Sequence, residues 1–161
     1  MSGFFVPVLR VTTLVASTAL LTCNMDQVFI FRAWISPTIP ASHGKVAPHW
    51  YRSFLDQLLA PLSGYLLVSL VSAAANVYIR TEGDDLARKW YAANFVFAIL
   101  HMAPAVKAYE QIKLIWDRDG DGKSNLKGMK GWLAVNTVRA WISDIPAFVC
   151  ALIATGLMVK L

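Results

Sequence analysis

The chain has little charge, little cysteine and none of the glycine-rich motifs that bind nucleotides. Only 16% of its 161 residues are charged, whereas about a quarter are charged in an ordinary soluble domain. The sequence contains no dinucleotide or flavin glycine fingerprint, no phosphate-binding P-loop and no HExxH zinc motif. These absences argue against a soluble domain of ordinary composition. They leave any catalysis to side chains acting with dioxygen or water.

Other absences bear on partners and covalent links. The two cysteines, Cys23 and Cys150, both lie in apolar runs, where packing is a better interpretation than a disulfide or a redox pair. The net charge of +5 is not accompanied by a basic stripe interleaved with aromatic residues, so nucleic acid is not an expected partner. No cofactor is expected either. The length fits a single domain over residues 1–161.

What the chain has in excess is apolar residues, which make up 57% of it and gather in four long runs. A membrane-spanning helix needs about 20 mainly apolar residues, and the short alternating segments of a membrane barrel are missing. The sequence therefore predicts an all-α fold, an up-down bundle of four transmembrane helices. The first run is interpreted as a helix and not as a cleaved signal peptide, because it is long and has a polar end. The predicted helices lie near residues 11–33, 56–79, 89–109 and 132–158.

This topology places both termini on the same side of the membrane. The loops after the first and third helices carry most of the Lys and Arg residues, so the positive-inside rule places these loops in the cytoplasm. The expected location is an integral, multi-pass position in a membrane, with the endoplasmic reticulum as the candidate organelle. The expected partners are the lipid bilayer and a hydrophobic small-molecule substrate, and the sequence leaves a homo-oligomer open.

Ionisable side chains at membrane depth are costly, so they mark either a site or a structural pair. Asp26, His101 and Arg139 fall at similar depths, in the half of the bundle nearer the first and third loops. Their convergence predicts one polar cavity. Asp26 is the expected partner of Arg139, because Asp144, five residues further along the helix, points in a different direction. The candidate catalytic residues are Asp26, Asp56, His101, Arg139 and Asp144, and the candidate substrate-binding residues are Asn24, Trp50, Asn94 and Asn136.

The third loop matches the first half of a calcium-binding loop. Asp117, Asp119 and Asp121, followed by Gly122, occupy the first four fixed positions of an EF-hand. The glutamate that should complete the calcium site is replaced by Gly128. A hydrophilic connector is therefore favoured over a calcium site, no metal is predicted, and calcium is expected to have no large effect on stability.

Three short motifs resemble a known family. They are the polar end of the first helix, the His-Trp-Tyr-Arg stretch at 49–52, and Trp132 with Asn136 and Arg139 at the start of the fourth helix. On these motifs the chain resembles the small four-helix integral membrane family that includes the fungal anthrone oxygenases. The resemblance implies oxidation of hydrophobic polyketides without a recognisable metal or flavin motif. Other small fungal membrane proteins of similar layout hydrolyse or cyclise epoxides.

Three functions follow as hypotheses. In an oxygenase, His101 or Asp26 would remove a proton from a polyketide, dioxygen would react with the carbanion, and Arg139 would stabilise the enolate. In an epoxide hydrolase or cyclase, one carboxylate would activate water or a substrate hydroxyl, while a second, protonated one donates to the epoxide oxygen. In a non-catalytic scaffold or lipid-binding protein, Asp26 and Arg139 would only pair, to join two helices.

Overall fold

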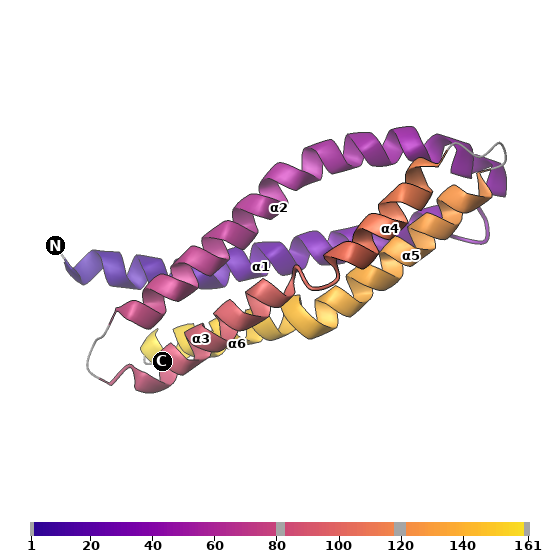
Figure 1. The fold of residues 1–161 in the computed structure, drawn as a ribbon. Coiled ribbons are helices and arrows are strands. Elements are labelled where there is room, and N and C mark those ends of the chain that lie inside the picture. The colour runs from indigo at the N-terminus through magenta and orange to yellow at the C-terminus, as the bar shows by residue number, and fades with distance from the viewer. Residues whose placement is uncertain (1, 80–82, 118–121, 160–161) are drawn as a thin grey trace.

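The chain folds into four helical rods (Figure 1). The computed structural model describes residues 2–79, 83–117 and 122–159. The first two rods are single long helices, α1 (Ser2–Trp34) and α2 (Ala47–Tyr78), which are connected through a 3-10 turn, η1 (Ala41–Val46). Every regular element in the described ranges is helical, which confirms the predicted all-α class.

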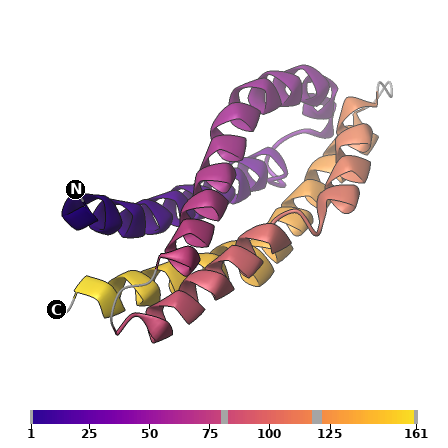
Figure 2. The same cartoon turned by 60° about the vertical axis from the view of Figure 1, so that its left-hand side comes forward.

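The third and fourth rods are interrupted. The third consists of α3 (Asp85–Leu100) and α4 (Ala105–Trp116), separated by a short turn. The fourth consists of α5 (Lys123–Arg139), a π-helical segment η2 (Ala140–Asp144) and α6 (Ile145–Val159), which continue into one another. The start of α1, the end of α2, the start of α3 and the end of α6 lie at one end of the bundle (Figures 1 and 2). The up-down order of the rods matches the prediction.

Three helical stretches are long and apolar enough to cross a membrane. They are Phe5–Trp34, Ala41–Tyr78 and Lys123–Met158. The third rod does not qualify, because its break leaves helices of 16 and 12 residues. Large apolar side chains also cover much of the outer surface, as at Leu67 and Val96, which are 61% and 54% exposed. These features are compatible with a membrane protein, and a fourth crossing stays a prediction.

The break in the third rod interrupts the helix expected near residues 89–109. Pro104 has no N–H group with which to continue the helical hydrogen bonding. The end of α3 instead tightens into shorter turns, in which His101 donates to the carbonyl of Ala98 at 3.2 Å and Ala103 to that of Leu100 at 3.0 Å. The break leaves His101 at a helix end.

The other rods begin earlier than their apolar runs. α2 begins at Ala47 and α5 at Lys123, whereas hydropathy suggested starts near 56 and 132. Hydropathy marks the segment that lipid can cover, but helical hydrogen bonding continues as far as packing supports it. The early turns of both helices pack in an aromatic cluster at the loop end of the bundle, formed with Phe31 of α1.

The half of the interior nearer the chain termini contains many polar side chains. Between α1 and α2, the hydroxyl of Thr13 donates to that of Ser72 at 2.9 Å, and the hydroxyls of Ser17 and Ser69 lie 3.1 Å apart. Asn76 adds an amide donor to Thr13 at 3.1 Å. Small residues with hydroxyl or amide groups let membrane helices approach closely and bond to one another. This half of the bundle is therefore held by polar contacts more than by large side chains.

Candidate active site

A buried histidine–carboxylate pair joins the third rod to the fourth. Nδ1 of His101 lies 2.7 Å from Oδ1 of Asp144, and the two side chains are 4% and 0% exposed. The amide of Asn24 in α1 donates to Oδ2 of the same carboxylate. The hydroxyl of Ser143 lies 3.2 Å from Oδ1 and 2.8 Å from the carbonyl oxygen of Phe97, so its one hydrogen is shared between two acceptors. These contacts compensate for burying Asp144.

The π-helical segment η2 positions the carboxylate. The N–H of Ile145 donates to the carbonyl of Ala140, five residues earlier, and Pro146 then follows without an N–H of its own. Such segments are rare and often occur at functional sites. The wider turn brings residues five apart closer to one face than an α-helix does, and Arg139 and Asp144 are both buried in the interior. The expectation that these two side chains diverge assumed an uninterrupted α-helix.

Arg139 is a buried cation without a paired anion in contact. Its side chain is 6% exposed, and its guanidinium carbon lies 5.9 Å from the ring centre of Trp132. Among the described residues, none forms an ion pair with Arg139, and none bonds to its Nε. Since a buried charge without a paired anion is costly, Arg139 is a candidate for a functional group.

An apolar cavity of about 390 Å³ lies against His101 and Arg139. Its walls come from α2, the α3–α4 turn, α4 and α5, and its polar groups are few. A cavity that is mostly apolar, with a small number of polar groups at one place, is the usual form of a site for a hydrophobic small molecule. The residues that line it are Leu55, Leu58, Leu59, Leu62, Ser63, Leu66, His101, Met102, Ala105, Ala108, Tyr109, Ile112, Trp132 and Arg139.

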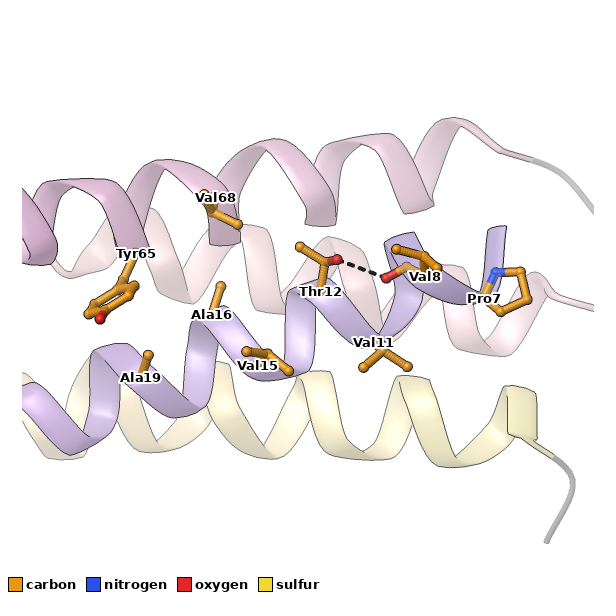
Figure 3. A pocket seen from close by; sticks show the side chains of 9 residues that line it. All are labelled: Pro7, Val8, Val11, Thr12, Val15, Ala16, Ala19, Tyr65 and Val68. Carbon is orange, nitrogen blue, oxygen red and sulfur yellow. Dashed lines mark hydrogen bonds between the residues drawn. The ribbon is translucent and has the colours of Figure 1, made fainter. Parts of the chain in front are cut away.

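Two other hollows lack this combination. One of about 480 Å³ shares Leu55 and Leu59 with the cavity and is lined also by Pro48, His49, Arg52, Asp56 and Trp116. The other, of about 560 Å³, is a groove between α1 and α2 (Figure 3), lined by Pro7, Val8, Val11, Thr12, Val15, Ala16, Ala19, Tyr65 and Val68. In this groove the Thr12 hydroxyl is already bonded to the carbonyl of Val8 at 2.8 Å. Neither hollow brings a buried base and a buried cation together.

The structure brings together four of the residues predicted for the site. Asn24 and His101 each form a hydrogen bond with Asp144, and Arg139 lines the same cavity as His101. The other two asparagines serve helix packing. Asn136 donates to Oε1 of Gln27 at 2.9 Å, and Asn94 donates to the carbonyl of Ala147 at 2.7 Å and to the hydroxyl of Ser17 at 3.0 Å.

Asp26, Asp56 and Trp50 lie away from the pair. Asp26 is exposed and forms no ion pair with any described residue, so the expected contact between Asp26 and Arg139 is wrong. Asp26 follows Asn24 by two positions, about 200° around a helix, and Asn24 is the residue that faces inward. Asp56 is exposed beside the neighbouring hollow. Trp50 stacks on Phe54, with ring centres 5.2 Å apart, in the aromatic cluster.

Three contacts in or near the site were not predicted from the sequence. They are the hydrogen bonds between Gln27 and Asn136 and between Ser143 and Asp144, and the ring contact between Tyr51 and Trp132. The spacing of Asn24 and Gln27, three residues apart on one helix face, could have indicated the first. In the third loop, Asp119 and Asp121 lie outside the described residues. Asp117 accepts a hydrogen bond from Ser124 at 3.4 Å. No group of three metal-ligating side chains lies together in the described part of the chain.

Several of the proteins similar to this chain are named as epoxidases, and another as a biosynthesis cluster protein. A probable epoxidase, scpX, from Mollisia scopiformis is 28% identical over 149 residues, covering 91% of this chain and 92% of that protein. Epoxidase pydX from an Acremonium species is 26% identical, covering 88% of each chain. The oxaleimides biosynthesis cluster protein N of Penicillium oxalicum is 28% identical, covering 92% of this chain and 88% of the relative. The similarity thus extends over nearly the whole length of both chains.

The names of these relatives indicate modifying enzymes of fungal secondary metabolism. No protein-family profile matches the chain, so membership of the anthrone oxygenase family stays a resemblance. No solved structure matches it either.

Proposed function

We propose that the chain is an integral membrane enzyme that adds oxygen to a hydrophobic secondary metabolite, with His101 as the base. The observation that carries this proposal is the His101–Asp144 pair at the wall of an apolar cavity that also contains Arg139. The names of the relatives support oxygen addition over other reactions of the same groups. The endoplasmic reticulum is the proposed membrane.

The pair suits proton abstraction. With the proton of the neutral imidazole on Nδ1, the Nδ1–H of His101 donates a hydrogen bond to Asp144, and Nε2 has a free lone pair with which to accept a proton from the substrate. Asp144 fixes this tautomer and stabilises the imidazolium that forms. Hydrogen bonds from Asn24 and from Ser143 of η2 hold the carboxylate in place. Asp144 is therefore a positioning residue, and His101 is the group that would contact the substrate.

The reaction can be balanced with dioxygen as the oxidant and the substrate as the reductant. His101 takes the proton of an acidic C–H group, and the resulting carbanion is stabilised by the charge of Arg139. The carbanion gives two electrons to dioxygen, a C–O bond forms, and the peroxide takes up the proton. A neighbouring C=C bond can then accept the outer oxygen as an epoxide while the O–O bond breaks, and the inner oxygen remains as a hydroxyl.

A second candidate is the opening or cyclisation of an epoxide. It is favoured by the unbonded N–H of Arg139, which can donate to an epoxide oxygen while His101 activates a hydroxyl or water. The version with two carboxylates in one cavity is weaker than the sequence suggested, because Asp26 and Asp56 are both exposed. The non-catalytic hypothesis also loses its main support, since it rested on a pair between Asp26 and Arg139.

Isotope labelling tests the reaction class. Cells expressing the chain are supplied with ¹⁸O₂, or with H₂¹⁸O in a parallel culture, and the product that depends on the gene is identified by mass spectrometry. The proposal predicts label from ¹⁸O₂ in the product. Label from water alone would contradict oxygenation and favour hydrolysis, and a product with neither label would favour cyclisation.

A further inference from the structure

Three buried hydrogen-bond donors beside the cavity have no partner among the described residues. They are the hydroxyl of Tyr51, Nε1 of Trp132 and Nε of Arg139. The three residues are 0%, 5% and 6% exposed. A donor buried without an acceptor is costly, and nearly all such groups in folded proteins are satisfied by some acceptor.

These donors belong to one neighbourhood. The rings of Tyr51 and Trp132 meet edge to face, with centres 5.6 Å apart, and the guanidinium of Arg139 lies 5.9 Å from the Trp132 ring centre. Trp132 and Arg139 are seven residues apart on one face of α5, and both line the cavity. Tyr51 precedes the lining residue Leu55 by one turn of α2 and reaches this neighbourhood through its ring contact with Trp132.

The chemistry of the three groups is uniform. A tyrosine hydroxyl, an indole N–H and a guanidinium N–H can all donate, and the guanidinium adds a positive charge. The buried asparagine oxygens that also lack partners, on Asn24, Asn94 and Asn136, are acceptors and do not line the cavity. A ligand in the cavity therefore lies beside the donor-bearing side chains of Trp132 and Arg139 at this end, with Tyr51 packed against Trp132, and meets apolar side chains along the leucine wall of α2.

We propose that Tyr51, Trp132 and Arg139 form a binding site for a substrate oxygen, which would be a carbonyl that develops into an enolate, or a phenolate. This inference rests on the proposed function and narrows its substrate to apolar molecules that carry such an oxygen. Donors aimed at the atom where negative charge develops stabilise a transition state more than a ground state. The oxygen would be bound here while His101, in the same cavity, removes the neighbouring proton.

A pair of probes, bound in the absence of dioxygen so that neither can be oxygenated, tests the site apart from catalysis. 9-Fluorenone and fluorene differ at one carbon, which carries a carbonyl in the ketone and two hydrogens in the hydrocarbon. Fluorenone has no hydrogen beside its carbonyl, so it cannot undergo proton abstraction. Binding of each probe is measured to the full chain in lipid nanodiscs, with empty nanodiscs as the background, and infrared spectroscopy records the carbonyl stretch of bound fluorenone.

The wild-type chain is expected to prefer fluorenone to fluorene and to lower its carbonyl stretching frequency. Tyr51→Phe and Trp132→Phe should each reduce this preference by about two- to tenfold, the value of one neutral hydrogen bond. Tyr51→Phe, which removes only the hydroxyl oxygen, should leave fluorene binding unchanged. The matched controls Tyr65→Phe and Trp141→Phe, at side chains 38% and 69% exposed, should change neither measurement.

Several outcomes would overturn the inference: equal binding of the two probes, no binding of fluorenone, or a carbonyl frequency that the Tyr51→Phe variant leaves unchanged. Tyr51→Phe removes a single oxygen atom, and retained fluorene binding shows that the cavity is intact. His101→Gln separates this inference from the proposed function. It should lower turnover strongly and yet keep the preference for fluorenone. The binding preference therefore tests the donor site, and turnover tests His101 as the base, independently of each other.

Discussion

At the scale of single residues, Asp144 has the most partners of any acidic group in the described interior. It contacts His101, Asn24 and Ser143, which come from three separate stretches of the chain. A carboxylate with no exposed surface would otherwise be costly, and removing one member of a buried charged contact usually costs more than the contact itself contributes. The stability of the chain should therefore depend on Asp144 and hardly at all on Asp26.

A comparison of Asp144→Asn with Asp26→Asn measures this difference. Asp144→Asn weakens charge-assisted hydrogen bonds and should lower the free energy of unfolding by about 1.5–3 kcal/mol. The control Asp26→Asn changes an exposed side chain and should stay within about 0.5 kcal/mol of the wild type. Unfolding in detergent, followed by circular dichroism, gives both values. Similar losses in the two variants would show that the burial of Asp144 has no special role.

At the scale of elements, packing of α4 on α5 forms one wall of the cavity, and it depends on the absence of a side chain at Gly128. A Cβ atom there would lie 2.7 Å from the backbone nitrogen of Ile115 and 2.9 Å from the carbonyl oxygen of Gln111. Backbone atoms cannot move aside as the end of a flexible side chain can. The two helices can remain this close only with glycine at the contact.

Gly128→Ala should therefore destabilise the chain, by about 1–3 kcal/mol, because α4 and α5 must separate. Gly64→Ala is the matched control, since no atom lies within 4 Å of its added Cβ, and alanine in a helix interior is expected to be neutral or to stabilise by up to about 1 kcal/mol. Thermal unfolding of the two variants compares them directly. The packing argument fails if Gly128→Ala is as stable as Gly64→Ala.

The sequence predicted the elements better than their interruptions. Apolar runs of sufficient length predict helices because a bilayer or a buried interface requires them, and four rods are found. Pro104 and Pro146 were visible, but the sequence does not say whether a proline in such a helix causes a bend, a turn or a π-helical segment. Those outcomes depend on which neighbour satisfies the freed carbonyl groups. The contact between His101 and Asp144 depends on the turn in the third rod and on the π-helical segment in the fourth. With regular helices assumed, the sequence predicts a pair between Arg139 and Asp26 instead.

At the scale of the whole molecule, the two ends of the bundle differ. Arg10 and Asp84 form an ion pair at the end that contains the termini, and the aromatic cluster and the cavity lie toward the other end. α2 bows away from the other rods along part of its length, and Pro61 lies within it (Figures 1 and 2). Proline is a common cause of such a bend. The leucines of α2 that line the cavity lie both before and after Pro61.

Cysteine mapping tests the membrane topology. Cysteines introduced at Thr38 and Asp85, which are exposed at opposite ends of the rods, should react with a membrane-impermeant reagent from opposite sides. Cysteines at Val68 and Val96 should not react from either side, because these exposed apolar positions would face lipid. Reaction at Val96 from water would show that the third rod, which is broken in the structure, does not cross the membrane.

The central claim is that His101, oriented by Asp144, is the base of this enzyme. The most direct measurement uses the precursor that accumulates in cells lacking the gene, which is supplied to membranes containing the wild-type chain, His101→Gln or the exposed control His43→Gln. Mass spectrometry follows conversion to the oxygenated product. The account predicts that His101→Gln lowers the rate by about 10²–10⁴-fold, the usual contribution of a general base, while His43→Gln retains the wild-type rate. Wild-type turnover by His101→Gln would contradict it.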